Sequence, residues 1–392
     1  MDEFEVAVFG AGIAGASLAW RLAAHCRVLL LEREAQPGMH STGRSAAMFM
    51  ESYGPPAVRA LTRASRAFYE APPPGFTGQR LLGERGVLYL ATLGQETLLR
   101  QTHDELAAGS VHVAFVDADD ALQRVPCLLR ECVHGALWEP DAQDIDVNAL
   151  RQGFLRGLRH AGGTLRLGAA LRSAQRRGDQ WQLEFADGVA LRARSVVDAA
   201  GAWADELAAL FGAAPIGLEP RRRSAFTFKP PEGTDVSRWP AVVGVDESYY
   251  FKPDAGQLLG SPANADPTVP HDVMPEELDI AMGIHRIESV TTLRIRRPSS
   301  TWAGLRSFVR DGELVIGWDD VCPAFFWLAA QGGYGIQSAA GASALAASLL
   351  LDRVLPDELI RHGVDAQAVS PRRLRYQGSH DDRTGPAAGH SD

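Results

Sequence analysis

The sequence predicts an α/β protein: a Rossmann-like dinucleotide-binding domain that carries an inserted α+β domain with a mixed sheet. Three observations lead to this expectation. Residues 5–34 follow the order strand, glycine turn, helix, strand, and a second glycine-rich turn leads into a helix at 331–337. Between them lies a long stretch, 215–300, that is rich in strand-forming residues and prolines. Because both ends of the chain carry parts of a cofactor site, the middle is expected to form the second domain.

The first glycine turn reads Gly10-x-Gly12-x-x-Gly15 and follows an apolar run that ends at Phe9. In such a turn Gly10 permits the sharp exit from the strand, and Gly12 lets the backbone approach a pyrophosphate. Gly15 lets the helix lie close to the sheet, so that the N–H groups at the helix N-terminus face the phosphates. The turn therefore predicts a dinucleotide site.

Glu32 closes the second apolar run, Val28–Leu31. A carboxylate at this point accepts hydrogen bonds from the ribose hydroxyls of an adenosine, and it repels a 2′-phosphate. The unit therefore favours FAD or NAD over NADP. The motif alone leaves the choice between FAD and NAD open.

Composition excludes several classes of function. The chain has 392 residues, 46% of them hydrophobic and 22% charged, which suits a globular protein of two domains. A net charge of −9 disfavours nucleic acids and anionic membranes as partners. No uncharged apolar run reaches the ~20 residues of a transmembrane helix, and no signal peptide precedes the first strand. We expect a cytoplasmic protein, with contact at the periphery of the inner membrane left open.

The four cysteines show no metal-ligand spacing, and no metal site is predicted. Reduced thiols are the expectation for Cys26, Cys127, Cys132 and Cys322.

Hydrophobic periodicity predicts the remaining elements. Helices are expected at 57–70, 95–108, 147–161 and 338–351. Strands are expected at 86–91, 164–167, 181–185, 190–193 and 195–203, with 164–167, 181–185 and 190–193 antiparallel, and the apolar runs 313–316 and 325–330 precede the second glycine turn. The resulting division assigns 1–50, 142–220 and 305–375 to the cofactor domain, 51–141 and 221–304 to the second domain, and 376–392 to a disordered tail.

Four motifs in order give the chain a family resemblance: Gly10–Gly15 with Glu32, Ser41-Thr-Gly-Arg-Ser-Ala-Ala47, Val196-Val-Asp-Ala-Ala-Gly-Ala-Trp203 and Gln331-Gly-Gly-Tyr-Gly-Ile-Gln337. The chain resembles the flavin-dependent D-amino-acid dehydrogenases and oxidases, a group that includes glycine and sarcosine oxidases. It looks most like bacterial D-arginine dehydrogenases, from about residue 4 to 374. The resemblance implies a fold of the D-amino-acid oxidase/glycine oxidase type and resolves the cofactor as FAD.

The resemblance also implies which residues hold FAD, without a covalent bond. Glycines 10, 12 and 15 with Ala14 would hold the pyrophosphate, and Glu32 with Arg33 would meet the ribose. Leu171 would contact the adenine. The segment that wraps the pyrophosphate and the flavin edge would be Ser41, Thr42, Gly43, Arg44, Ser45, Ala46, Ala47 and Met48. The turn that approaches the flavin would be Gly332, Gly333, Tyr334, Gly335, Ile336 and Gln337.

Family enzymes pass a hydride from the substrate α-carbon to the flavin, which requires a firmly positioned substrate. By resemblance, Arg222 and Arg306 would clamp the α-carboxylate, because a planar guanidinium matches it. The charged neighbours of Arg222 could take its role. Tyr53 and Tyr250 would contact the substrate through their hydroxyls.

Two departures from the D-arginine dehydrogenase pattern bear on the substrate. Val87 stands where an acidic residue would pair with a substrate guanidinium, and Met48 stands where a histidine is expected. With Gly333 these residues are predicted to line the substrate site. We expect broad specificity that is shifted toward apolar D-amino acids, because an unpaired buried cation costs several kcal/mol.

Three alternatives stay open. The chain could be a D-arginine dehydrogenase proper, a glycine- or sarcosine-type amine oxidase that uses oxygen, or an FAD- or NAD-binding protein without turnover. The physiological electron acceptor is not identified by the sequence, and a quinone or the respiratory chain is a candidate.

Overall fold

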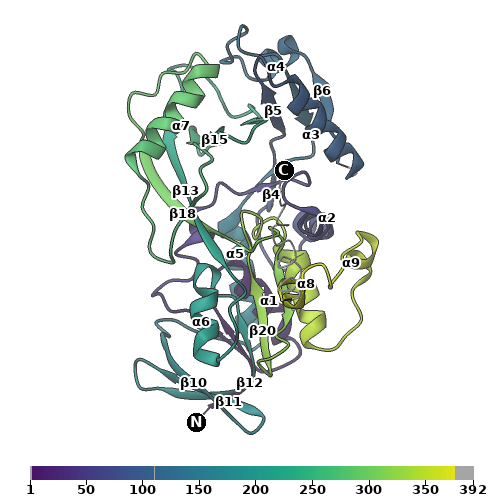
Figure 1. Cartoon of the computed structure of the whole chain (residues 1–392), viewed down its shortest axis with the longest axis vertical. Helices are drawn as coiled ribbons and strands as arrows, with labels where there is room; N and C mark the ends of the chain where they lie inside the picture. Colours follow the sequence, from purple (N-terminus) through teal and green to yellow (C-terminus); the bar gives the residue numbers. More distant parts are fainter. Residues whose placement is uncertain (1, 110, 376–392) are drawn as a thin grey trace, which may run out of the picture.

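A computed structural model describes residues 2–109 and 111–375. The molecule is elongated, with one large sheet at the end that holds the N-terminus and a second at the opposite end (Figure 1). Two long strands, β13 (Glu219–Phe228) and β18 (Ser300–Phe308), run between them. The predicted tail, 376–392, lies outside the described residues, and the domain boundaries remain a prediction.

The first sheet has eight strands in the order β10-β11-β12-β1-β2-β9, with β20 beside β12 and β19 beside β20. Its centre is parallel, because β1 pairs in parallel with β2 and with β12. The bounds are β1 Asp2–Phe9, β2 Val28–Leu31, β9 Thr164–Arg166, β10 Leu171–Arg177, β11 Gln180–Phe185, β12 Ala190–Asp198, β19 Val315–Trp318 and β20 Phe325–Ala329.

Two strand predictions in this sheet need correction. Strand β9 is not antiparallel to β11 and β12. It follows α5 and pairs in parallel with β2 at the edge of the sheet. The separate strands expected at 190–193 and 195–203 form one strand, β12, that ends at Asp198. Residues 201–203 instead form a short 3₁₀ helix, which begins at Gly201 with a φ of 61°.

The second sheet has nine strands and is mixed, since β5 and β14 pair in parallel and the other neighbours are antiparallel. Its order is β17-β13-β16-β15-β14-β5-β7-β6, with β18 beside β13. Besides β13 and β18, its bounds are β5 Val87–Ala91, β6 Ala114–Val116, β7 Gly135–Glu139, β14 Ala241–Gly244, β15 Tyr250–Asp254, β16 Gln257–Ser261 and β17 Asp266–Pro267. A small third sheet contains β3 Met48–Phe49, β8 Gln143–Ile145 and β4 Leu82–Glu84.

The helices predicted at 57–70, 95–108, 147–161 and 338–351 are present within one or two residues of the expected ends. One helix, α7, was missed inside the stretch expected to be strand-rich. The bounds are α1 Ile13–Ala23, α2 Pro56–Glu70, α3 Glu96–Ala108, α4 Ala118–Arg124, α5 Val147–His160, α6 Ala204–Phe211, α7 Glu277–Val290, α8 Ala339–Leu350 and α9 Asp357–Arg361. None of the described helices is long and apolar enough to cross a membrane.

The helices divide the core into layers. On one face of the eight-stranded sheet α1, α5 and α8 form a single hydrophobic cluster, and α6 packs on the other face. Ile287 of α7 packs with Phe226 and Phe228 of β13 against one face of the nine-stranded sheet. Since side chains alternate along a strand, the odd-numbered residues of β13 lie on the opposite face, away from α7.

Candidate functional site

Three adjoining cavities lie along the cofactor motifs. The first measures about 450 Å³ and is lined by Gly10, Gly12, Glu32, Arg33 and Leu171 among others. The second measures about 130 Å³ and shares Gly12, Ser41 and Thr42 with the first. The third measures about 110 Å³ and shares Ser45, Ala46 and Gly333 with the second. Together they form one continuous row of hollows.

The first glycine turn is packed as its sequence predicts. A Cβ on Gly15 would lie 1.9 Å from the carbonyl oxygen of Gly10, so α1 reaches the strand only because residue 15 lacks a side chain. Gly10 has a φ of 99°, a conformation that favours glycine. Helix α1 begins after Gly12 without a side-chain cap and without an acidic residue in its first turn. Its N-terminus therefore presents a positive dipole end to the cavity.

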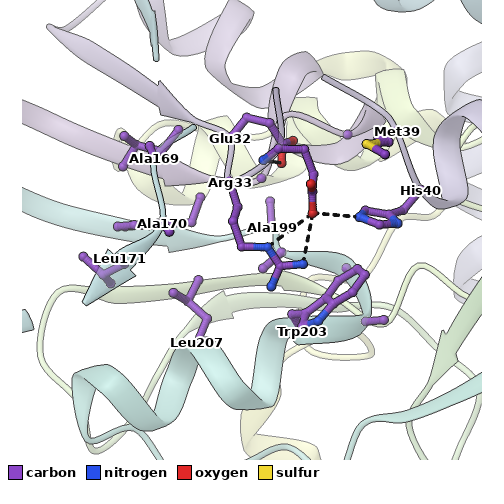
Figure 2. Close-up of a pocket in the computed structure, with 18 of the residues that line it drawn as sticks. Glu32, Arg33, Met39, His40, Ala169, Ala170, Leu171, Ala199, Trp203 and Leu207 are labelled. Carbon is purple, nitrogen blue, oxygen red and sulfur yellow. Dashed lines mark hydrogen bonds and ion pairs between the residues drawn. The ribbon is translucent and has the colours of Figure 1, made fainter. Parts of the chain in front are cut away.

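Glu32 lies at the first cavity with its carboxylate held by the backbone (Figure 2). Oε2 accepts a hydrogen bond from the N–H of Ala11 at 2.9 Å, and Oε1 accepts one from the N–H of Glu34 at 3.0 Å. A carboxylate oxygen has two lone pairs, so each can still accept a ribose hydroxyl. This donor set suits an adenosine.

Arg33 lies beside the same cavity, with about half of its side chain exposed. Its guanidinium lies 4.6 Å from the ring centroid of Trp203 and pairs with Glu34 at 3.2 Å (Figure 2). Glu34 also pairs with His40 at 3.0 Å, and these hydrogen bonds hold the pKa of the Glu34 carboxyl below its usual value although partial burial opposes them. The cluster closes one side of the cavity.

The 41–48 segment and the 332–337 turn line the second and third cavities. Ala14, Arg44, Ser45, Ala46, Gly332, Gly333, Gly335 and Ile336 line the second, and Ala47, Met48 and Gln337 line the third. The three cavities together start at the Glu32 carboxylate, pass the N-terminus of α1 and end between the two glycine-containing segments. This arrangement has the shape of an extended FAD. The residues present therefore fit this cofactor.

Several predicted cofactor residues make structural contacts, and three of them, Gly15, Gly43 and Tyr334, line none of the three cavities. A Cβ on Gly43 would lie 2.6 Å from the carbonyl oxygen of Gly38. Tyr334 packs edge-on against Tyr53, with ring centroids 4.9 Å apart. The Arg44 guanidinium donates to the carbonyl oxygens of Val273 and Ala303, both at 3.0 Å, and pairs with Asp272, so it clamps a neighbouring loop.

Arg306 and Tyr53 form the centre of the third cavity. Nη1 of Arg306 donates a hydrogen bond to the Tyr53 hydroxyl at 2.7 Å. Burial is the largest single influence and lowers the pKa of Arg306, but the phenols of Tyr53, Tyr250 and Tyr334 together more than offset it, so the net shift of this pKa is upward. No carboxylate pairs with Arg306 among residues 2–109 and 111–375. Its positive charge is therefore available for a ligand.

Gly333 approaches this pair closely. A Cβ there would lie 2.9 Å from Nη1 of Arg306 and 3.0 Å from the Tyr53 hydroxyl. Glycine at 333 thus leaves room for both groups.

Arg223, and not the predicted Arg222, is the second arginine that lines the cavities beside Arg306, so the expectation was one residue out of register. Arg222 lines none of the three cavities; it pairs with Asp279 at 3.0 Å, with Asp266 at 3.5 Å and with Glu276. It lies on the α7 side of β13, the side of Phe226 and Phe228. The next residue, Arg223, faces the opposite side and lines the second and third cavities.

Arg223 has no carboxylate partner within the described part of the chain, and its buried Nε makes no hydrogen bond there. Burial, followed by the charge of Arg306, lowers its pKa to about 10. Two neighbouring guanidiniums without a counter-ion form a site for an anion, since an unpaired buried charge is costly until a ligand neutralises it.

The expectation for Val87 also needs correction. Val87 is fully buried in a cluster with Met50 and Tyr89 and does not line the third cavity. The cavity is lined instead by Tyr89, which lies two residues further along β5 on the same face. Met48 lines it as predicted.

Several lining residues escaped the sequence analysis, namely Met50, Tyr89, Arg223, Ala241, Val243, Glu247, Lys252 and Ala263. The sequence of β13 does contain a signal for Arg223. Phe226 and Phe228 mark the even-numbered face of the strand as the one packed against α7, so the odd-numbered Arg223 is expected on the opposite face. Ala241 and Val243 come from β14, which pairs with β5, and Lys252 comes from β15, which pairs with β14. No local motif indicates that pairing.

Comparison with known proteins settles the family. A family model described as FAD dependent oxidoreductase (DAO) matches residues 5–349. The chain belongs to this family. Its cofactor is accordingly FAD, and the alternative of an NAD-binding module is excluded.

The chain is 31% identical over 269 residues to a tRNA 5-methylaminomethyl-2-thiouridine biosynthesis bifunctional protein MnmC from Burkholderia vietnamiensis, covering 65% of this chain and 39% of that protein. It is 25% identical over 268 residues to mitochondrial dimethylglycine dehydrogenase from Rattus norvegicus, covering 67% of this chain and 31% of that protein. The chain thus spans about a third of the length of these relatives.

Solved structures share the fold. Glycine oxidase from Geobacillus kaustophilus superposes with a TM-score of 0.81 at 21% identity, covering 94% of this chain and 98% of that one. L-proline dehydrogenase from P. horikoshii gives 0.81 at 18% identity, covering 95% and 98%. Iminodiacetate oxidase from Chelativorans sp. BNC1 gives 0.79 at 20% identity, covering 94% and 99%. The predicted fold type is confirmed.

Proposed function

We propose that this FAD-dependent oxidoreductase is a D-amino-acid dehydrogenase. The observation that carries the proposal is the pair of buried guanidiniums, Arg223 and Arg306, which lack a carboxylate partner within the described residues and face a cavity beside the 41–48 and 332–337 segments. Such a pair suits the α-carboxylate of an amino acid. The D configuration rests on the motif resemblance to D-amino-acid dehydrogenases.

Bound FAD supplies the oxidant, taking a hydride from the substrate α-carbon to give an imino acid, which water hydrolyses to a 2-oxo acid and ammonia. The protein's task is to orient the substrate. Arg306 and Arg223 hold the carboxylate, and the hydroxyls of Tyr53 and Tyr250 complete the contacts at that end. The glycine turn at 332–335 leads toward α8, whose positive dipole end lies near the cavity.

The side chain of the substrate is proposed to be neutral and predominantly apolar. Besides Met48, the third cavity has an apolar lining of Ala47, Met50, Ala241, Val243, Ala263 and Ile336. Such a wall accepts aliphatic chains of different shapes, since methionine side chains adapt readily. We therefore propose broad specificity, with D-methionine and D-leucine oxidised better than D-arginine.

FAD is proposed to be held without a covalent bond. None of Cys26, Cys127, Cys132 and Cys322 lines the three cavities. The electron acceptor is proposed to be a quinone or another component of the respiratory chain, reached from the cytoplasm.

A second candidate function is a glycine- or sarcosine-type amine oxidase that uses oxygen. Lys252 favours it, because a cationic ammonium beside the reaction cavity can assist oxygen reduction, and Lys252 lines the third cavity. Its Nζ atom, however, is already bound to Asp144 at 2.6 Å.

The deciding experiment mixes the holoenzyme anaerobically with single amino acids and follows the flavin absorbance. We expect bleaching by D-methionine and D-leucine, a slower response to D-arginine and none to the L-enantiomers, with a 2-oxo acid as product. Bleaching by glycine or sarcosine alone would support the second candidate. Rapid oxygen consumption under air would identify an oxidase and contradict the dehydrogenase assignment.

A further inference from the structure

A cluster of three charged side chains forms one wall of the third cavity. Lys252 lines the cavity and is only 6% exposed in its side chain. Its Nζ atom donates to Oδ1 of Asp144 at 2.6 Å, and Oδ2 of the same carboxylate accepts from Nε of Arg85 at 2.7 Å. Arg85 is fixed further by the carbonyl oxygens of Ser237 and Trp239, at 2.9 and 2.8 Å.

The charges of this cluster do not cancel. One carboxylate, Asp144, serves two cations, so the wall keeps one surplus positive charge. Of the three, only Lys252 reaches the cavity, because Arg85 lies behind Asp144. Glu247 also lines the cavity from the exposed tip of a turn, and its carboxylate offsets part of the charge of Arg223 at the other end of the cavity.

The charged wall lies where the side chain of the substrate is proposed to extend. Lys252 and Tyr250 lie two residues apart on the same face of β15, so Tyr250 contacts the carboxylate end while Lys252 lies further along the strand. Asp144 pairs in register with Met48, one of the residues proposed to meet the side chain. The wall therefore lies on the side of the cavity away from Arg306.

We infer that Lys252, with Asp144 and Arg85, sets the charge selectivity of the substrate cavity by excluding cationic side chains. This inference rests on the proposed function, in which Arg223 and Arg306 hold the carboxylate and point the side chain toward Lys252. Two like charges about 8 Å apart in a medium of effective dielectric constant about 20 repel enough to weaken binding about thirtyfold. Lys252 is thus a specificity-determining residue that acts on the substrate directly.

The test uses hexanoate and 6-aminohexanoate, carboxylates of equal chain length that differ in a terminal ammonium. Their dissociation constants are measured on the holoenzyme by calorimetry. In the wild type we expect 6-aminohexanoate to bind at least about tenfold more weakly. In Lys252→Met the ratio of the dissociation constant of 6-aminohexanoate to that of hexanoate should fall at least about fivefold. Asp144 keeps its partner Arg85 in this variant. The ratio of kcat/KM for D-norleucine over D-lysine should fall in parallel.

The chain offers a matched control, because Lys229 is its only other lysine, is exposed and lines none of the three cavities. Lys229→Met changes the net charge equally and should leave both ratios unaltered. Asp144→Asn raises the surplus charge and should increase discrimination, and it supplies the test if Lys252→Met does not fold. Unchanged ratios in a folded, FAD-loaded Lys252→Met protein would overturn the inference. Absence of oxidation of any amino acid, with the binding ratios as expected, would instead overturn the proposed function.

Discussion

Arg306 and Tyr53 are joined by a 2.7 Å hydrogen bond from Nη1 to the phenol oxygen, although they come from opposite ends of the chain. Tyr53 lies just before α2, whereas Arg306 belongs to β18. The Tyr53 backbone is anchored as well, because its carbonyl oxygen accepts from Nε2 of Gln337 at 3.1 Å. The bond therefore ties together the two segments that face the proposed substrate carboxylate.

Removing the Tyr53 hydroxyl is expected to weaken substrate use. In Tyr53→Phe the buried guanidinium of Arg306 loses an acceptor, a loss worth about 1.5–3 kcal/mol for a charged donor. We expect kcat/KM for D-methionine to fall at least about tenfold in steady-state assays. Tyr249→Phe is the control: the Tyr249 hydroxyl is buried and has no hydrogen-bond partner among the described residues. Equal losses in both variants would contradict the role of Tyr53.

Replacing the two neighbouring arginines should give opposite results. Arg223→Met removes a cation from the cavity, so we expect KM for D-amino acids to rise about 10- to 100-fold with little change in thermal stability. Arg222→Met breaks the pairs with Asp279 and Glu276, so we expect a lower melting temperature and a nearly unchanged KM. Steady-state kinetics and thermal denaturation of both variants check this. A larger KM effect in Arg222→Met would reverse the assignment.

A methyl group at residue 333 should disturb the clamp. In Gly333→Ala the new Cβ would lie about 3 Å from both Arg306 and Tyr53, so one of them must move. We expect at least a tenfold loss of kcat/KM, with the FAD content measured after denaturation unchanged. Gly78→Ala serves for comparison, because a Cβ there meets no heavy atom within 4 Å. Wild-type kinetics for Gly333→Ala would show that the close approach has no functional role.

Asp198 should make the protein less stable as the pH rises. It lies fully buried at the end of β12, and burial raises its pKa well above the ordinary 3.8 despite a hydrogen bond from the N–H of Ala200. The folded state thus keeps a proton that the unfolded state loses above about pH 4. The free energy of unfolding therefore falls by about 1.4 kcal/mol per pH unit from this group, until the pH passes its folded-state pKa.

Asp198→Asn removes this titration. We expect its melting temperature to exceed that of the wild type at pH 8 and the difference to shrink toward pH 5. Thermal scans of both proteins across this range measure it. A difference that is constant with pH would mean that Asp198 is ionised in the folded protein.

The βαβ unit was predictable from sequence because its contacts are local. Gly10, Gly12 and Gly15 lie in one turn, and the strand that follows α1 pairs directly with β1. Gly15 is required by a neighbour five residues away, since a Cβ there would lie 1.9 Å from the Gly10 carbonyl oxygen, and Gly10 is required by its own φ of 99°. The glycine-rich turn at 331–337 and the helix after it were also predictable, since Gly335 is constrained by Gln331 four residues earlier, although Gly333 is constrained by the distant Arg306 and Tyr53.

The sequence predicted only in part which residues of β13 face the cavity. Both Arg222 and Arg223 are present in the sequence, and which one faces the cavity depends on which face α7 covers. The alternation with Phe226 and Phe228 carried that information, but α7 itself was not predicted. A shift of one residue exchanges the two faces of a strand, so a motif match that is one position out selects the wrong arginine.

The sequence by itself determined the family's dinucleotide turn, its acidic ribose partner and the order of the elements, because these depend on residues close together in the chain. Only the tertiary structure decided that Arg223 rather than Arg222 joins Arg306, that Val87 is core, and that Lys252 reaches the cavity. These positions depend on the successive pairing of β5, β14, β15, β16 and β13, strands separated by more than a hundred residues at the extremes. Long-range pairing fixes which side chains share a face, and no short stretch of sequence contains that information.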